Sequence, residues 1–193
     1  MKIISFSGIS NSGKTTLIEN LCKILTPKYQ VGVIKHDPKS KAIFDTEGKD
    51  SYRFFQSGAN VAVVSPKETN IRFNNSLDNT EIINILNTYK KLDYLFIEGF
   101  KSMPYKKICV IRGDFVQSDF DLCDAIATTN QYKDNFKNKI VLDLDNYKEI
   151  MMSYLGKEID SLIIENVDTS ERINIADIEG PKIIELYSGF CPS

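Results

Sequence analysis

The feature that most constrains this chain is a phosphate-loop pattern close to its start. The stretch Gly8–Thr15, GISNSGKT, fits G-x-x-x-x-G-K-[ST], and it directly follows the apolar run Ile3–Ser7. An amphipathic helix is expected from Lys14 to about Leu25. A strand, a glycine-containing loop and a helix in this order are typical of proteins that bind nucleotide phosphates.

Each residue type in the loop has a task in binding an anion. Gly8 and Gly13 allow tight turns, so that successive N–H groups point inward around a phosphate. Lys14 supplies a mobile positive charge, and Thr15 is expected to coordinate Mg²⁺. The helix adds its free N–H groups and the positive end of its dipole. The expected nucleotide contacts in this region are Gly8, Ser10, Asn11, Ser12, Gly13, Lys14, Thr15 and Thr16.

Strand-like and helical patterns alternate along most of the chain. Strands are expected at residues 3–7, 31–35, 60–65, 94–98, 108–111, 125–128 and 140–144, and helices at 14–25, 51–57 and 78–90. This alternation predicts parallel pairing, and apolar runs without period-2 alternation predict a sheet covered on both faces. The sequence therefore predicts a three-layer α/β P-loop NTPase fold with a mostly parallel sheet. Its ligand should lie beyond the carboxyl ends of the strands.

The length of 193 residues suits one domain of ordinary size. We expect a nucleotide-binding domain over residues 1–155 and a C-terminal extension over 156–193, packed on the same domain or at a dimer contact. The extension is expected to hold a helix at 157–167 and short strands at 172–175 and 182–186. Such strands need a partner, which a sheet edge or a second copy in a homodimer would provide.

Charge and composition narrow the classes of partner. The net charge of -2 comes from 24 basic and 26 acidic side chains mixed along the chain, so it gives no reason to expect nucleic acid or an anionic membrane as a partner. With no apolar run of membrane-spanning length and no room for a signal peptide, a cytoplasmic protein is expected. The cysteines are expected to be reduced because they are far apart and form no C-x-x-C pair: Cys22, Cys109, Cys123 and Cys191.

Glu98 is the favoured carboxylate for the metal and for catalysis alongside Lys14. It closes the apolar run 94–98, at the edge of the sheet where the phosphate loop also lies. There it can hold Mg²⁺ through water or orient water near a γ-phosphate. Asp93 begins the same run and would lie ~17 Å away at about 3.3 Å per residue. The alternative is that Glu98 only caps a turn.

The segment 35–51 is too polar for a core and is expected to form a binding loop, a lid or a solvated connection. His36 is the only histidine, so a site of several histidines within one chain is excluded. It could contact phosphate or substrate, or form hydrogen bonds in a turn. Asp45 is expected to reach the magnesium region, with plain solvent exposure as the alternative.

Several further segments resemble one protein family when taken together with the phosphate loop. They are Val33-Ile34-Lys35-His36, Asp45 with Gly48-Lys49-Asp50-Ser51, Gly58-Ala59, Glu98-Gly99-Phe100-Lys101 and Lys107-Ile108-x-Val110-x-Arg112. In this order, over about residues 1 to 130, they resemble the MobB family, the adaptor proteins of molybdopterin-guanine dinucleotide biosynthesis. The chain differs from some relatives at Asp37-Pro38-Lys39, where it lacks additional histidines.

The resemblance implies a GTP-binding protein with weak hydrolytic activity. Such a protein assists the molybdenum cofactor guanylyltransferase, which joins a guanine nucleotide to molybdopterin. On this resemblance Lys14 and Thr15 bind phosphate and magnesium, and Glu98 serves the metal and its water. Lys101 and Arg112 would contact a pyrophosphate, or the phosphate of molybdopterin or its guanine dinucleotide, or they are surface charges. A homodimer is expected.

Guanine preference rests on the resemblance, because the N-K-x-D signature that many GTPases use for the base is absent. Asp124 or Asn130, on either side of the strand at 125–128, could read a base edge, or the segment after that strand is an ordinary turn. Two other classes stay open. A kinase of a nucleoside or small metabolite would use an aspartate of the 35–51 segment as its base. A pure binding module would recruit a partner when nucleotide is bound.

Overall fold

The computed structural model describes residues 1–100, 103–113, 115, 120–136, 138–155, 163–165 and 172–174. The chain divides into two compact units, Met1–Tyr147 and Lys148–Ser193. Among these described residues, no helix is both long and apolar enough to cross a lipid bilayer. Of the expected site residues, Lys101 lies outside the described part of the chain, and the others belong to the first unit.

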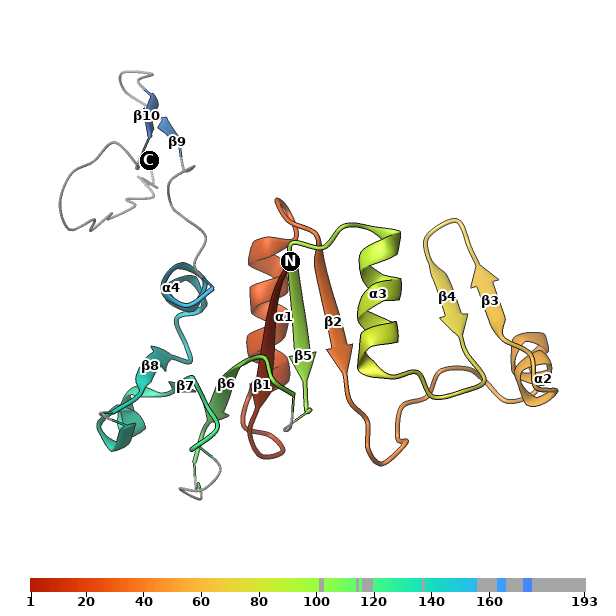
Figure 1. The fold of residues 1–193 in the computed structure, drawn as a ribbon, viewed down its shortest axis with the longest axis horizontal. Coiled ribbons are helices and arrows are strands. Elements are labelled where there is room, and N and C mark those ends of the chain that lie inside the picture. The colour runs from red at the N-terminus through yellow and green to blue at the C-terminus, as the bar shows by residue number, and fades with distance from the viewer. Residues whose placement is uncertain are drawn as a thin grey trace, which may run out of the picture. The chain divides into compact units, whose positions relative to one another are not determined.

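Six strands of the first unit form a single sheet. They are β1 (Lys2–Ser7), β2 (Val31–Lys35), β5 (Tyr94–Glu98), β6 (Lys106–Ile111), β7 (Ala125–Thr128) and β8 (Ile140–Asp143). Their order across the sheet is β2-β5-β1-β6-β7-β8, and every neighbouring pair is parallel (Figure 1). The expected α/β P-loop fold with a mostly parallel sheet is confirmed. All six carboxyl ends therefore lie at one edge, where a ligand is expected.

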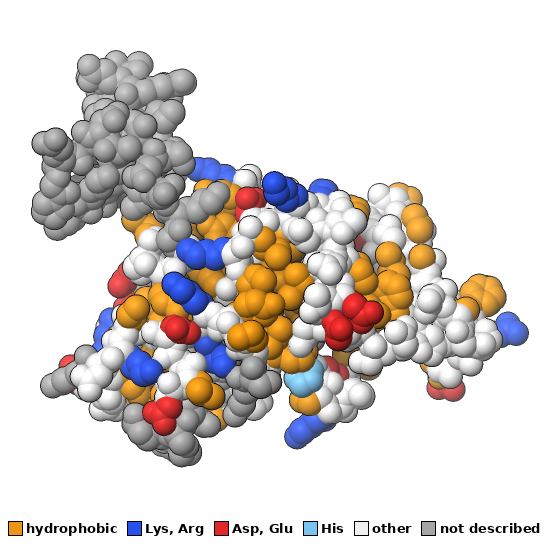
Figure 2. All heavy atoms as spheres, in the orientation of Figure 1, with side chains coloured by type: hydrophobic (Ala, Val, Ile, Leu, Met, Phe, Trp, Pro, Cys, Tyr) orange, Lys and Arg blue, Asp and Glu red, His pale blue; other side chains and the backbone are white. Residues whose placement is uncertain are grey.

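Helices pack on both faces of the sheet. Helix α1 (Lys14–Leu25) buries Leu17, Ile18, Leu21 and Leu25, which recur at helical spacing. Successive side chains of β5 alternate between the faces. Phe96 packs edge-on against Phe6 at 5.4 Å between ring centroids, whereas Leu95 and Ile97 belong to the cluster that contains Ile83 of α3 (Asn79–Tyr89). Figure 2, which looks at the face opposite α1, shows hydrophobic side chains gathered over the middle of the sheet.

The strand expected at 60–65 is present as β3 (Val61–Val64), but it lies outside the main sheet. It pairs antiparallel with β4 (Thr69–Arg72), a strand that the sequence analysis did not predict. A tight turn explains this pairing, because Ser65 N–H donates to Glu68 O at 2.9 Å and brings the chain straight back. Helix α2 (Asp50–Gln56) precedes the hairpin along the chain, close to the expected range 51–57.

The last elements differ more from expectation. A 3₁₀ helix (Asn130–Phe136) follows β7, and α4 (Tyr147–Ser153) follows β8. The helix expected at 157–167 is wrong at Ile163–Glu165, which forms β9 and pairs antiparallel with β10 (Arg172–Asn174). The pairing with β10 gives this segment a strand conformation that its own pattern does not indicate, because strand preference depends on the neighbouring strand. The strand expected at 172–175 is confirmed as β10, and the one expected at 182–186 lies outside the described residues.

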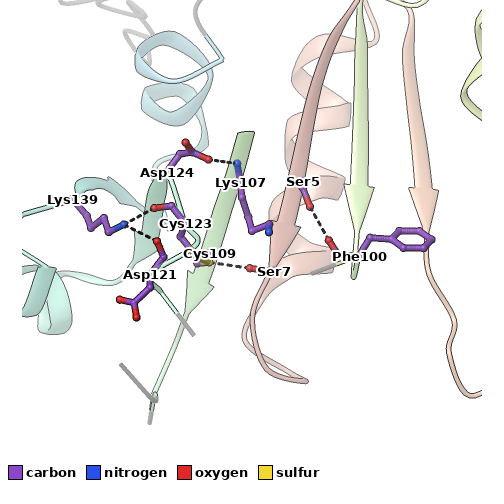
Figure 3. The surroundings of a disulfide bond; sticks show 9 residues. All are labelled: Ser5, Ser7, Phe100, Lys107, Cys109, Asp121, Cys123, Asp124 and Lys139. Carbon is purple, nitrogen blue, oxygen red and sulfur yellow. Dashed lines mark hydrogen bonds between the residues drawn. A yellow bond between two sulfur atoms is a disulfide. The ribbon is translucent and has the colours of Figure 1, made fainter. Parts of the chain in front are cut away.

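The expectation that all cysteines are reduced is wrong for Cys109 and Cys123, which form a disulfide (Figure 3). Cys109 is in β6 and Cys123 lies just before β7, and their Cα atoms are 5.9 Å apart. The 14-residue separation hides this pairing in the sequence, since only the return of the chain to the neighbouring strand brings the two thiols together. Cys22 is a free thiol whose pKa is raised by burial.

Candidate functional site

The loop between β1 and α1 has the backbone conformation that its glycines predict. Gly8, Asn11 and Gly13 adopt φ angles of 140°, 63° and 99°. Gly8 lies against β6, where a Cβ atom would approach the carbonyl oxygen of Val110 closer than 3.0 Å. The neighbouring strand therefore requires glycine at this position for steric reasons as well as conformational ones.

The N-terminus of α1 is open to an anion. Gly13 is its N-cap, no side chain of the described residues caps the helix, and no acidic residue occupies the first turn. The first N–H groups of a helix have no partner within the helix, and they carry the positive end of its dipole. Phosphate is the kind of ligand that satisfies both.

Lys14 reaches back across the phosphate loop. Its Nζ donates hydrogen bonds to the carbonyl oxygens of Gly8 at 2.9 Å and Ile9 at 2.6 Å, and lies 3.5 Å from Ser12 Oγ. These acceptors are neutral, so a phosphate arriving at the loop can offer the ammonium group stronger, charge-assisted hydrogen bonds. Ser12 itself is fully buried and supports the loop from within.

Glu98 comes to the phosphate loop because of the alternation along β5, which directs its side chain to the face that α1 covers. Thr15 Oγ1 donates to Glu98 Oε1 at 3.2 Å, and Lys35 Nζ donates to Glu98 Oε2 at 3.3 Å. Glu98 is 12% exposed and Lys35 is 61% exposed. Lys35 is not among the site residues expected from the sequence. The sequence could have indicated this role, because Lys35 is the last residue of β2 and Glu98 is the last residue of β5, and the two are register partners in adjacent parallel strands.

A hollow of about 480 Å³ lies at this point and collects the predicted residues. It is lined by Ser10, Asn11, Gly13, Lys14, Thr15, Thr16, Lys35 and Glu98. The structure thus joins most of the phosphate loop to a carboxylate more than eighty residues further along the chain. Gly8 and Ser12 do not line this hollow, and they shape the loop behind it.

The donors around the Thr15–Glu98 contact suit a magnesium ion. Mg²⁺ prefers oxygen ligands and is usually held by one or two carboxylates together with substrate phosphates and water. The Thr15 hydroxyl and the Glu98 carboxylate are oxygen donors of this kind, 3.2 Å apart. Among the residues that the structure describes, no three His, Cys, Asp or Glu side chains gather around a metal position. These two donors therefore fit an ion that takes its remaining ligands from a bound phosphate and from water.

Asp45 has different partners, away from the lining of this hollow. It accepts hydrogen bonds from Ser51 Oγ at 3.2 Å and Arg72 Nη1 at 3.0 Å, and Arg72 lies over the ring of Phe55. Desolvation would raise the pKa of Asp45, but the Thr46 N–H, Ser51 and the Arg72 charge outweigh it and lower that pKa. The D-x-x-G-K-D-S spacing thus joins Asp45 to the start of α2. A magnesium role for Asp45 stays a prediction.

His36 also lies outside the lining of the hollow. The backbone N–H of His36 donates to the backbone carbonyl oxygen of Glu98 at 2.9 Å, and the His36 ring stacks on the Phe100 ring with centroids 4.1 Å apart. A Cβ atom on Gly99 would lie 3.3 Å from His36 Cβ, so the two segments pack closely. His36 therefore holds the end of β5 in place, and a direct phosphate contact by His36 stays a prediction.

Arg112 lies directly after β6 and lines a second hollow, of about 210 Å³. Its Nη2 donates to Asp145 Oδ1 at 2.9 Å. Asp124, in contrast, accepts the N–H of Lys107 at 2.8 Å at the amino end of β7 (Figure 3). That is the edge of the sheet opposite the phosphate loop, so Asp124 is not placed to read a base. Asn130 does lie at the carboxyl edge, where the 3₁₀ helix begins.

Known proteins match most of this first unit. The family model for molybdopterin guanine dinucleotide synthesis protein B matches residues 3–131. The chain belongs to the MobB family. The match includes the phosphate loop, Asp45, Glu98 and Arg112, and it confirms the resemblance drawn from the sequence.

Relatives and a solved structure agree with this assignment. The molybdopterin-guanine dinucleotide biosynthesis adapter protein of Escherichia coli is 31% identical over 116 residues, which are 57% of this chain and 65% of the relative. The adapter protein of Haemophilus influenzae is 29% identical over 118 residues, 60% of this chain and 66% of the relative. The crystal structure of Bacillus subtilis MobB aligns with a TM-score of 0.62 and 26% identity, covering 75% of this chain and 91% of that one. The chain matches less than two thirds of the length of these two adapter proteins.

Proposed function

We propose that this protein is a magnesium-dependent GTP-binding adapter that assists the attachment of a guanine nucleotide to molybdopterin. The observation that carries the proposal is the Thr15–Glu98 contact beside the uncapped N-terminus of α1, with Lys14 across the loop. Membership of the MobB family supports the biosynthetic role, since relatives are named as adapters of molybdopterin-guanine dinucleotide biosynthesis.

Three residues that line the hollow of about 480 Å³, called the phosphate hollow from here on, have a part in the proposal: Lys14, Thr15 and Glu98. The N–H groups of α1 and the Lys14 ammonium neutralise the phosphate oxygens. Thr15 and Glu98 would hold Mg²⁺, which when bound neutralises charge on the phosphates. Glu98 also orients the attacking water. Among the described residues that line the hollow, Glu98 is the one carboxylate, and both of its oxygens already accept hydrogen bonds. Slow hydrolysis by the isolated protein is therefore expected.

The proposed partner is the molybdenum cofactor guanylyltransferase in the cytoplasm. Lys101 and Arg112 are the proposed contacts to the phosphate of molybdopterin or its guanine dinucleotide.

We also propose a homodimer. The exposed Val64 and Ile71 of the β3–β4 hairpin support it, because the hairpin pairs with no other strand in the described part of the chain and exposed apolar side chains favour association. Chromatographic size with light scattering tests the dimer, and a monomer across working concentrations would contradict it.

Calorimetric titration with GTP and ATP in the presence of Mg²⁺ tests the nucleotide proposal. Lys14→Ala should weaken GTP binding about 10- to 150-fold, because it removes charged hydrogen bonds to phosphate. Lys23→Ala is the matched control, since Lys23 is an exposed lysine of the same helix that pairs with Glu19. Equal affinities for the two variants would contradict the phosphate-loop assignment.

Hydrolysis is tested separately by Glu98→Gln. This variant should keep most nucleotide affinity but lose roughly a hundredfold in turnover, the usual scale for a positioned acid or base. Glu19→Gln on the outer surface of α1 is the control. Unchanged turnover in Glu98→Gln would remove Glu98 from the chemistry.

A metabolite kinase is supported less well by the geometry. Asp37 accepts the N–H groups of Lys39 and Ala42, and Asp45 is paired with Arg72, so neither is placed as a base in the hollow. A clear preference for ATP, with phosphate transfer to an acceptor, would nonetheless favour the kinase.

A further inference from the structure

A second hollow adjoins the phosphate hollow at the start of α1. Its volume is about 210 Å³, and the two hollows share the lining residues Asn11, Gly13 and Thr16. The other lining residues of the second hollow are Leu17, Arg112, Leu144 and Tyr147. A ligand with an anionic end and a flat, partly apolar body can therefore occupy both hollows by passing over the first turn of α1.

The residues that the phosphate loop does not supply come from two neighbouring regions of the sheet edge. Leu144 follows β8, and a Cβ atom on Gly13 would meet its Cδ2 at 3.8 Å, so Leu144 packs directly against the loop. The N–H of Leu144 donates to Thr128 O at 2.9 Å. Leu17, Leu144 and Tyr147 make this hollow less polar than the phosphate hollow, as the flat faces of a base require.

The carboxylate of Asp145 lies beside this hollow, in an ion pair with Arg112 whose two side chains are 63% and 52% exposed. Asp145 Oδ1 accepts a hydrogen bond from Arg112 Nη2 at 2.9 Å, and Arg112 itself lines the hollow. The N–H of Asp145 donates to Asp143 Oδ1 at 3.0 Å, while Lys133 holds the other oxygen of Asp143 at 3.3 Å. Within the described part of the chain, Asp145 Oδ2 has no hydrogen-bond partner. The turn and the arginine thus hold an acceptor that still has capacity for a ligand.

Resting on the proposed nucleotide function, we propose that this second hollow takes the purine base and that Asp145 selects guanine. Guanine presents two adjacent donors, N1–H and the 2-amino group, which a carboxylate can accept together. Adenine presents an acceptor at N1 and no 2-amino group, so the same carboxylate would face a lone pair. Arg112 acts as a positioning residue for Asp145, and its remaining N–H donors stay available for phosphate.

The test compares GTP, XTP, ATP and inorganic triphosphate by calorimetry with Mg²⁺, for wild type and Asp145→Asn. Asparagine keeps an acceptor for N1–H and adds a donor, which suits the 2-oxo group of xanthine. Asp145→Asn should lose roughly 10- to 100-fold in GTP affinity and gain affinity for XTP, with inorganic triphosphate unchanged. A gain for XTP cannot come from a general loss of folding. Asp121→Asn makes the same charge change before β7 and should alter nothing.

The outcomes separate the two proposals. If wild type binds neither GTP nor triphosphate, the proposed function fails and this inference with it. If wild type binds GTP but Asp145→Asn keeps the GTP to XTP ratio of wild type, the base assignment is overturned while the proposed function stands. Equal binding of GTP and ATP by wild type, or an equal shift in Asp121→Asn, also overturns the assignment.

Discussion

Replacing Gly8 by alanine would test how the phosphate loop is built. At this position φ is 140°, and the added Cβ would approach the carbonyl oxygen of Val110 closer than 3.0 Å. The obstructing atom belongs to the backbone of β6, which pairs with both β1 and β7 and cannot move cheaply. Backbone strain of about 1–3 kcal/mol and overpacking of about 1–3 kcal/mol both oppose the variant.

We therefore expect Gly8→Ala to lower the free energy of unfolding by about 2–6 kcal/mol, and to weaken nucleotide binding because the loop must shift. Gly58→Ala is the control: φ there is 95°, but nothing lies within 4 Å of the added Cβ. That variant should cost only the conformational strain, about 1–2 kcal/mol. Urea unfolding followed by circular dichroism measures both. If the two variants are equally stable and Gly8→Ala binds GTP normally, the steric argument is refuted.

Three further predictions concern Asp45 and the disulfide. Asp45→Asn should lower the unfolding temperature of the nucleotide-free protein by several degrees, because it removes the charge that pairs with the largely buried Arg72. If Asp45 acts only on magnesium, that temperature should stay unchanged. Folding lowers the pKa of Asp45 from its ordinary value of 3.8, so the Asp45 carboxylate should stabilise the folded state above pH 3.8. This stabilisation should be lost as the pH falls through the lower pKa of the folded state. Acid unfolding of wild type and Asp45→Asn measures the difference. Thiol counting in denaturant without reductant should find two thiols, and a count of four would contradict the disulfide. Replacing Cys109 and Cys123 by serine should lower the free energy of unfolding, measured in urea, by about 3 kcal/mol.

Local signals predicted the central elements well. The strand, glycine loop and helix at the start of the chain depend on contiguous residues, and the structure has them as β1, the phosphate loop and α1. The apolar run ending in Glu98 likewise predicted β5 and the position of Glu98 at the carboxyl edge of the sheet, beside the phosphate loop. Alternation of strands and helices was enough to predict parallel pairing, because parallel strands need crossover connections.

Features that depend on distant residues were missed. The β4 strand is a short, exposed, polar segment, and its strand conformation depends on pairing with β3. The Cys109–Cys123 disulfide depends on the return of the chain between neighbouring strands, and Asp45 found its partner in Arg72, 27 residues away. The number of residues between two positions does not predict whether they meet, because a loop of a given length can close in many ways.

By itself the sequence determined the phosphate loop, the sheet type and the family, because each depends on residue types in a short, ordered pattern. Only the tertiary structure decided which side chains meet at the site. Strand register set Lys35 beside Glu98. The folded chain also brings Arg112, Leu144 and Tyr147 together around the second hollow, and Arg112 binds Asp145 beside it. Such contacts depend on the backbone hydrogen bonds between neighbouring strands, which bring together residues that are far apart along the chain.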